Sequence, residues 1–389
     1  MFSSRTQWSR APNRLHTLAA ARRGTDAFFD LTESNPTRCG FNYPEAELLA
    51  ALAQPAALRY APQPLGLEAA RAAVCSYYRD RGPVLDPDRL VLTASTSEAY
   101  TLLFRLLCDT GDAATMPTPS YPLFEMLARA NDVVLESVPM SYHAGWEMDP
   151  ARLAAAGPRT RAVLLVHPSN PAGNYVSQAA WWNVQELAAA RGWAVVVDEV
   201  FFDYPVADGA ARELDLASAP ALTFVLNGLS KLAGLPQMKL AWIAVFGPHA
   251  VRIEALARLE ILNDLYLSVD APVQHALPAI LALRHGLQDQ IRNRVRANLR
   301  TLDTALASHP SMQRLQLEGG WNAVLRLPRI LSDTEWAERI LEQAGVLVHP
   351  GHFYEFGLDA CLVLSLLPPV ETFAEAVRRI VAVAAHALT

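Results

Sequence analysis

The feature that most constrains the fold is a series of short runs that are apolar on both faces and alternate with longer helical segments. Two of these runs, Ala162–Val166 and Ala194–Asp198, read AVLLV and AVVVD. Strands that are buried on both faces are typical of mostly parallel sheets covered by helices on both sides. The alternation therefore predicts an α/β domain built on one mostly parallel sheet.

Seven strands are expected in this domain, which we assign to residues 46–275. They are Leu90–Thr93, Ala113–Met116, Val133–Val138, Ala162–Val166, Ala194–Asp198, Leu222–Leu226 and Ala241–Val245. The helices expected between them are Gly66–Arg81, Ser97–Cys108, Pro122–Ala130, Gln178–Arg191 and Ala250–Leu262.

A chain of 389 residues is long for one hydrophobic core, because single cores stop growing at about 250–300 residues. A long helix is expected from Pro272 to about His309, followed by shorter strands and terminal helices. The later strands expected are Met312–Leu317, Ala323–Leu327, Val346–His349 and Cys361–Leu366. We assign residues 276–389, together with 1–45, to a smaller α+β domain.

Composition excludes several classes of protein. The net charge of −6 and the pI near 5.9 argue against a nucleic-acid-binding protein, which normally presents a basic face. No apolar run reaches the roughly 18–20 residues that a membrane span needs, and the Arg-rich N-terminus has no secretory signal. The four cysteines are far apart and show no metal-ligand spacing, as expected in a reducing compartment. We therefore expect a cytoplasmic protein without a metal site.

Polar side chains follow four of the expected strands at the points where those strands end. Ser95, Thr96 and Ser97 follow the first, Asn170 follows Val166, Asp198 ends its own strand, and Ser230 with Lys231 follows Leu226. Open α/β sheets bind ligands beyond the carboxyl ends of their strands. We therefore expect one site at this edge of the sheet.

The residue types at this edge suggest a phosphorylated, nitrogen-containing ligand. Ser95 and Glu98 fit a capping box, and the start of a helix attracts a phosphate, although an ordinary helix cap explains the same residues. Asp198 ends an apolar strand, where an unpaired carboxylate is costly and a protonated ring nitrogen would compensate it. Lys231 is suited to forming an imine once its amine is deprotonated.

These residues lie in segments that resemble the class I/II aminotransferases, which are fold type I pyridoxal-phosphate (PLP) enzymes similar to aspartate aminotransferase. The resemblance covers nearly the whole chain and rests on seven segments in order. They are YAPQPLGLEAAR (60–71), TASTSEAY (93–100), PTPSYPLF (117–124), HPSNPAGN (167–174), DEVFFDY (198–204), LSKLAGLPQMK (229–239) and HPGHF (349–353).

The resemblance implies catalytic roles for three residues. Lys231 would hold pyridoxal 5'-phosphate as a Schiff base and then move the proton between the substrate Cα and the cofactor C4′. Asp198 would pair with the pyridinium nitrogen, and Tyr121 would stack on the ring.

The resemblance also implies a cofactor-binding set and a homodimer. Asn170 would donate to the ring O3′, and Tyr60 would reach the phosphate of the neighbouring subunit in a homodimer with shared sites. The cofactor phosphate would be surrounded by Ser95, Thr96, Ser97, Ser230 and Lys239.

Four positions depart from the family's usual pattern. Lys239 stands where an arginine is usual, Phe201 where a tyrosine is usual, and Gly228 where a hydroxyl residue is usual. Near the C-terminus, Val363 takes the place of the arginine that clamps the substrate α-carboxylate. A lysine still neutralises a phosphate as a point charge, whereas valine supplies no cation.

Either another cation replaces that arginine or the substrate lacks the carboxylate. The best substitute is Arg38, which with Asn35 belongs to the N-terminal segment ESNPTR (33–38) that matches the family's substrate-covering segment. A loop arginine that faces solvent explains Arg38 equally well. His349, His352 and Asn322 are further polar candidates.

The sequence leaves three functions open. The first is an aminotransferase that moves an amino group between an amino acid, or a related amine, and a 2-oxo acid. The second is a PLP-dependent lyase, decarboxylase or synthase on the same fold, since the cofactor permits all of these reactions. The third is a cofactor-binding protein without catalysis.

Overall fold

The large sheet has the seven strands that the sequence predicts, in the order β2-β10-β9-β8-β7-β3-β4. The structure is a computed structural model that describes residues 1–25, 27–207 and 212–388. Only β10 runs against its neighbours, β2 and β9, so the mostly parallel sheet is confirmed. The strands are β2 (Leu90–Thr93), β3 (Ala113–Thr118), β4 (Val134–Pro139), β7 (Thr160–Val166), β8 (Ala194–Asp198), β9 (Thr223–Gly228) and β10 (Ala241–Phe246).

Alternate residues of β8 enter two different cores, which shows why both faces of the strand are apolar. Val195 and Val197 belong to one core, and Ala194 and Val196 belong to the other. Helices α3, α7 and α10 supply the first core, and α4, α5 and α9 supply the second. The helices are α3 (Glu68–Arg79), α4 (Thr96–Leu107), α5 (Leu123–Ala130), α7 (Gln178–Arg191), α9 (His249–Asp264) and α10 (Ala271–Leu306).

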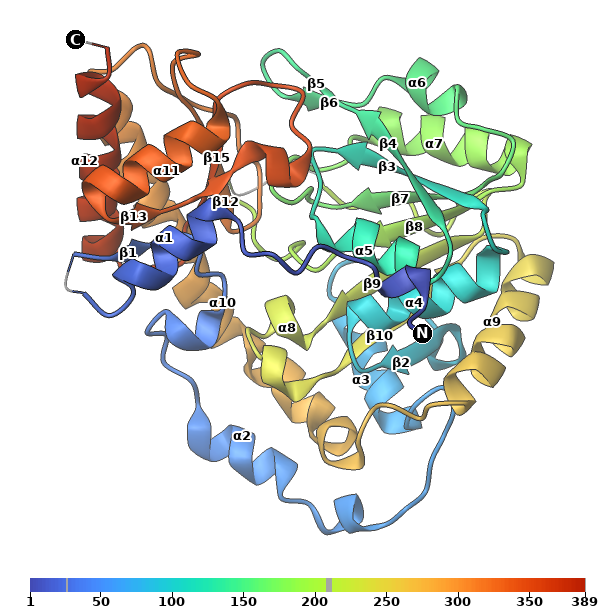
Figure 1. Ribbon diagram of the computed structural model, residues 1–389. Helices are drawn as coiled ribbons and strands as arrows, with labels where there is room; N and C mark the ends of the chain where they lie inside the picture. The colour runs from blue at the N-terminus through green and yellow to red at the C-terminus, as the bar shows by residue number, and fades with distance from the viewer. Residues whose placement is uncertain (26, 208–211, 389) are drawn as a thin grey trace.

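A second sheet lies at the other end of the molecule, where α1, α11 and α12 gather (Figure 1). Its strands pair antiparallel in the order β11-β12-β15-β14. The N-terminal β1 pairs with β13, so residues from both ends of the chain meet here. The elements are α1 (Arg14–Arg22), α11 (Asp333–Ala344), α12 (Val370–His386), β1 (Phe29–Asp30), β11 (Gln313–Arg314), β12 (Asn322–Arg326), β13 (Val346–Leu347), β14 (His349–Pro350) and β15 (Cys361–Ser365).

The strand predicted at Val346–His349 is two short strands in the structure. β13 pairs with β1, whereas β14 pairs with β15, so the chain changes sheets within this run. A core cluster that includes Leu15, Leu31 and Trp336 joins the N-terminal segment to the C-terminal elements. This packing agrees with the expected small domain, whose boundaries at residues 45 and 276 stay a prediction.

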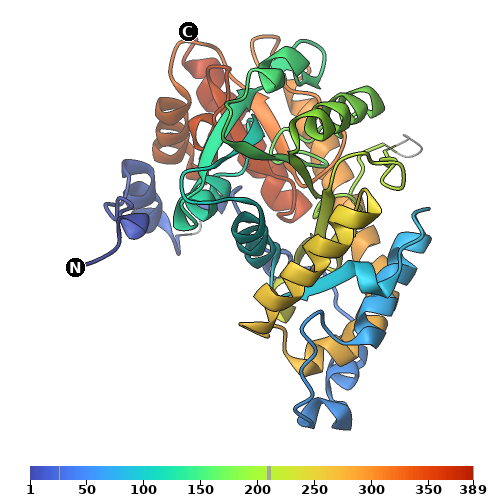
Figure 2. The same cartoon turned by 90° about the vertical axis from the view of Figure 1, so that its right-hand side faces the viewer.

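Shorter elements complete the described chain. In Figure 2 the N-terminal segment and the segment that carries α2 lie at opposite sides of the molecule. The remaining helices and strands are α2 (Glu45–Leu52), α6 (Pro150–Ala154), α8 (Leu229–Leu232), β5 (Ser141–Tyr142) and β6 (Trp146–Glu147). Short 3-10 helices span Ser4–Thr6, Pro36–Arg38, Pro55–Leu58, Pro87–Arg89, Pro236–Met238 and Gly351–Tyr354. Across the residues described, no helix combines the length and apolar character needed to cross a bilayer.

Candidate active site

A cavity of about 390 Å³ lies at the edge of the sheet where β2, β7, β8 and β9 end. It is lined by most of the residues that the sequence singled out, namely Ser95, Thr96, Ser97, Tyr121, Asn170, Asp198, Ser230, Lys231 and Lys239. A larger hollow of about 550 Å³ lies beside the β5–β6 hairpin, but none of its described lining residues is a lysine or arginine. The smaller cavity is therefore the candidate active site.

The start of α4 forms one side of this cavity. Ser95 is the N-cap of the helix, and its hydroxyl accepts the Glu98 N–H at 3.1 Å. The Glu98 carboxylate accepts the N–H of Ala94 at 2.6 Å, one residue earlier than a standard capping box. Thr96 and Ser97 occupy the first helical positions, where backbone N–H groups have no partner within the helix. The positive helix end and the Lys239 ammonium favour a phosphate here.

Asp198 is buried at the end of β8, with 4% of its surface exposed. Its carboxylate accepts the Tyr100 hydroxyl at 3.1 Å and the Val200 N–H at 3.0 Å. Burial raises the pKa of Asp198 to about 6, although these two hydrogen bonds oppose the rise. A cationic N–H at the cavity side of this carboxylate would stabilise its charged form.

Lys231 enters the same cavity from the short helix α8. Its Nζ lies 5.5 Å from the centroid of the Trp321 ring and 6.0 Å from that of Phe201. Burial lowers the pKa of Lys231, and the nearby Asp198 carboxylate partly opposes this effect. The Tyr204 hydroxyl donates to the Lys231 carbonyl oxygen at 2.7 Å, which fixes the backbone here. The amine is therefore positioned and more readily deprotonated than an exposed lysine.

Asn170 and Tyr121 face the cavity from two different loops. The Asn170 side-chain oxygen accepts the Asn322 amide N–H at 2.8 Å, so β12 of the second sheet orients it. Tyr121 is 44% exposed and contacts Phe124 edge-to-face, with 6.2 Å between ring centroids. An exposed aromatic face at a cavity mouth is suited to stacking on a planar ligand.

Two of the unusual residues have structural explanations. A Cβ added at Gly228 would lie 2.7 Å from the Cβ of Ala241 on β10, so a side chain does not fit without a shift. Phe201 packs edge-to-face on Trp321, with 5.3 Å between the ring centroids. Val363 is 2% exposed and carries no charge towards the cavity.

The structure does not bring Arg38 or Asn35 to the cavity. The Arg38 side chain is 73% exposed and lies 3.8 Å from the Glu33 carboxylate, so solvent and an acid neighbour compete for it. The Asn35 side chain instead accepts the Thr37 N–H at 3.1 Å as a helix cap. Tyr60 is 89% exposed and lines a separate hollow of about 340 Å³. His352 is also outside, whereas His349 and Asn322 line the cavity.

Several residues that line the cavity were not predicted from the sequence. Tyr100 lies one helical turn after Thr96, and this i, i+4 spacing could have revealed it. Thr32, Ser34 and Tyr354 come from distant parts of the chain, and no local pattern marks them.

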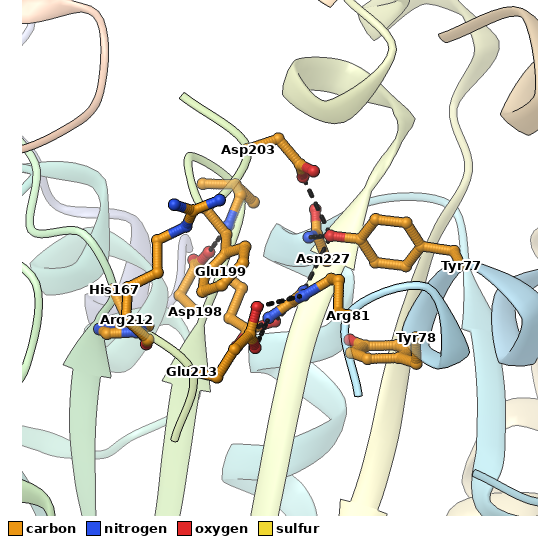
Figure 3. Close-up of polar contacts among 12 residues, drawn as sticks. Tyr77, Tyr78, Arg81, His167, Asp198, Glu199, Asp203, Arg212, Glu213 and Asn227 are labelled. Carbon is orange, nitrogen blue, oxygen red and sulfur yellow. Dashed lines mark hydrogen bonds and ion pairs between the residues drawn. The ribbon is translucent and has the colours of Figure 1, made fainter. Parts of the chain in front are cut away.

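A buried charge network lies behind Asp198 (Figure 3). Arg81, just after α3, donates to both oxygens of Glu199 at 2.8 and 3.0 Å and to the Tyr77 hydroxyl at 2.8 Å. Its guanidinium carbon lies 3.5 Å from the centroid of the Phe202 ring. The Glu199 side chain is 1% exposed, so its charge depends on Arg81. The network thus fixes the backbone beside Asp198.

The same network reaches the loop that carries Asn170. His167 accepts the Val176 N–H at its Nδ1, 2.9 Å away, and its Nε2 lies 2.8 Å from the Arg212 carbonyl oxygen. Burial lowers the pKa of His167 to about 3, so the ring is neutral and Nε2 donates. Both ring nitrogens are used, and His167 supports the loop rather than facing the cavity.

Comparisons with known proteins agree with this geometry. A sequence profile described as "Aminotransferase class I and II" matches residues 37–380. The chain is 27% identical over 388 residues to an alanine aminotransferase of Mycobacterium tuberculosis, covering 95% of this chain and 88% of that protein. It is 28% identical over 334 residues to an arginine–pyruvate transaminase of Pseudomonas aeruginosa, covering 83% of this chain and 82% of that protein.

Solved structures share the fold. An alanine aminotransferase from Pyrococcus furiosus superposes with a TM-score of 0.88 at 20% identity, covering 99% of this chain and 100% of that one. A mutant aspartate aminotransferase from Thermus thermophilus superposes with a TM-score of 0.85 at 23% identity, covering 98% and 99%. At these identities the likeness establishes the architecture.

Proposed function

The chain belongs to the class I and II aminotransferases, and from that premise we propose that Lys231 is the amine that holds the cofactor as a Schiff base. The protein is an enzyme, a PLP-dependent transaminase that moves an amino group between an amino compound and a 2-oxo acid. One observation carries the assignment of residues. Lys231 and Asp198 line the same cavity as the first residues of α4, and the start of a helix is suited to binding a phosphate.

The residues present fit pyridoxal phosphate. Asp198 is a buried carboxylate whose charged form lacks a cation in direct contact, and a ring N–H would supply one. Ser95, Thr96 and Ser97 offer hydroxyls at the start of α4, and Ser230 and Lys239 line the same cavity. These five residues are proposed to hold the phosphate.

When bound, the cofactor supplies an electron sink that stabilises negative charge at the substrate Cα. Asp198 would keep a proton on the ring nitrogen and so maintain the sink. Once its amine is released, Lys231 would take the proton from Cα and return it at C4′, as its lowered pKa favours. Asn170 would donate to the ring O3′, and Tyr121 would cover the ring and exclude water.

We propose a homodimer in which Tyr60 reaches the partner's cofactor phosphate. Leu58 is 91% exposed, Tyr60 89% and Leu265 67%. The segments 56–67 and 263–275 share a hollow of about 340 Å³, which Tyr60 lines. Exposed large apolar side chains grouped in this way are typical of protein–protein contacts.

A cytoplasmic location is proposed as well, since the cysteines are all free and three of the four are buried.

The relatives' names suggest substrates. Alanine aminotransferases and transaminases that use pyruvate are among the proteins this chain resembles over most of its length. We therefore propose alanine as an amino donor and 2-oxo monocarboxylic acids as acceptors.

A half-reaction experiment tests the proposal. The holoenzyme is mixed with alanine and other amino acids in the absence of an acceptor. We expect the visible absorption of the cofactor to be replaced by that of its amine form, with one equivalent of 2-oxo acid per site. Consumption of the donor without the amine form would instead indicate the lyase or decarboxylase alternative.

Two variants provide matched controls. Lys231→Ala should lose both the visible absorption and the half-reaction. Lys239→Ala should weaken cofactor retention while excess cofactor restores turnover, because only a phosphate contact is removed. Full turnover by Lys231→Ala would refute the assignment.

A further inference from the structure

Every turnover of a transaminase brings a 2-oxo acid, and so an α-carboxylate, into the cavity. Among the described residues that line it, the fixed cations are Lys231 and Lys239, and no arginine is present. The proposed function, on which this inference depends, assigns both lysines to the cofactor. With both lysines engaged in this way, the groups of this chain left to bind the carboxylate are the neutral hydrogen-bond donors that line the cavity.

His349 stands at the right place for this role. It belongs to β14, and the antiparallel register pairs it directly with Val363 of β15. Directly opposed residues of antiparallel strands present their side chains on the same face of the sheet. His349 lines the cavity, whereas Val363 contributes no polar group. The imidazole thus lies beside the position that a charged clamp would need.

The contacts of His349 leave one N–H for a ligand. Its Nδ1 lies 2.8 Å from the Tyr354 hydroxyl. Burial raises the pKa of Tyr354, so the phenol keeps its proton and is able to donate it to Nδ1. In that arrangement the ring proton sits on Nε2, for which no hydrogen bond to a described residue is present. Burial also lowers the pKa of His349, so the ring is neutral at neutral pH.

We propose that His349, held in one tautomer by Tyr354, binds the α-carboxylate of the 2-amino and 2-oxo acid substrates through its Nε2–H. Tyr354 is the positioning residue, and His349 is the residue that contacts the substrate. The enzyme then recognises the carboxylate through a neutral imidazole N–H, whereas the family usually uses the charged guanidinium of an arginine.

A matched pair of probes isolates the carboxylate. 2-Methylalanine lacks a Cα hydrogen and cannot complete the half-reaction. tert-Butylamine also lacks that hydrogen and has a methyl group in place of the carboxylate. Each is titrated into the holoenzyme, and the dissociation constant is read from the visible absorption of the bound cofactor. The ratio of the two constants measures recognition of the carboxylate, and differences in amine basicity cancel between variants.

The variants separate a direct contact from a structural role. His349→Ala should weaken 2-methylalanine binding about tenfold or more and leave tert-butylamine binding unchanged, as loss of a hydrogen bond to a charged group predicts. His349→Gln keeps a donor and should stay within about threefold of the wild type. Tyr354→Phe should give a smaller loss than His349→Ala, because Nε2–H is then only one of two tautomers.

The proposal is overturned if His349→Ala leaves the ratio of the two constants unchanged or weakens both probes equally. It is also overturned if the wild type binds both probes alike. These outcomes are distinguishable from failure of the proposed function, because wild-type turnover of alanine and the visible absorption are measured on the same samples. A holoenzyme that transaminates normally while His349→Ala keeps the ratio refutes the role of His349 alone.

Discussion

Replacing Arg81 with methionine removes the cation that holds a buried carboxylate behind Asp198. The Arg81 side chain is 9% exposed and that of Glu199 is 1% exposed, and two hydrogen bonds of 2.8 and 3.0 Å join them. Breaking a buried pair by removing one partner costs about 3–5 kcal/mol, because the remaining charge is left uncompensated. Glu213 adds little to this value, since it is 39% exposed.

Urea unfolding of the cofactor-free protein measures this loss. We expect Arg81→Met to lower the free energy of unfolding by about 3–5 kcal/mol. Adding Glu199→Gln should recover most of it, because the double variant no longer buries the Glu199 charge without its cation. The matched control is Arg258→Met, whose pair with Glu254 is equally close at 2.6 Å but 64% and 62% exposed. That pair should contribute only about 0.3–0.5 kcal/mol.

The reasoning fails if Arg81→Met costs no more than Arg258→Met. It also fails if the double variant is no more stable than Arg81→Met alone. Either result would mean that Glu199 takes up a proton or gains water at little cost, and that burial does not set the energy of this pair.

Three further predictions follow from single residues. Burial raises the pKa of Asp198 to about 6 from 3.8, so the folded cofactor-free protein binds an extra proton between these values. The stability that Asp198 contributes therefore falls by about 2 kcal/mol from pH 4 to pH 6. Asp198→Asn should abolish that part of the pH dependence, and an unchanged slope in urea unfolding would contradict the shift. Gly228→Ser should destabilise the protein by about 1–3 kcal/mol because an added Cβ would lie 2.7 Å from the Cβ of Ala241. Ala241→Gly should relieve only part of this loss, because the Ala241 Cα at 2.9 Å and the Leu240 carbonyl oxygen at 3.0 Å remain. Equal thermal stability of Gly228→Ser and wild type would be the contrary result. Arg38→Ala should change the KM for 2-oxo acids less than about twofold because its side chain is 73% exposed, and a tenfold increase would return Arg38 to the substrate site.

The sheet was predictable because the information is local. Ala194–Asp198 and Leu90–Thr93 match the observed strands at both ends, since each is a continuous apolar run with a polar stop. The two pieces of Val346–His349 could not be separated from sequence. Their division follows from the partner strand that each piece pairs with, and pairing between distant segments leaves no local pattern.

The part of the candidate site that lies at the strand ends could be predicted from the sequence. Asn170, Asp198 and Lys231 follow consecutive parallel strands, whose carboxyl ends meet at one edge by geometry. His349 comes from β14 of the second sheet and Tyr354 from the 3-10 helix that follows it, and their approach depends on how that part of the chain packs against the large sheet. The two alternatives for Arg38 stayed open in the sequence for the same reason. Its charge was visible in the sequence, but its direction towards Glu33 and solvent was not.

The pairing of β1 with β13 has a consequence for synthesis of the chain. Phe29 pairs in register with Val346, and its N–H donates to the Gly345 carbonyl oxygen at 2.9 Å, so β1 lacks its partner strand until roughly 300 more residues have been made. At about 5–20 residues per second, this delay is on the order of 15–60 s. Throughout it Leu15 and Leu31 lack the apolar neighbours that later bury them. The amino-terminal segment is thus the part of a nascent chain that most needs a chaperone.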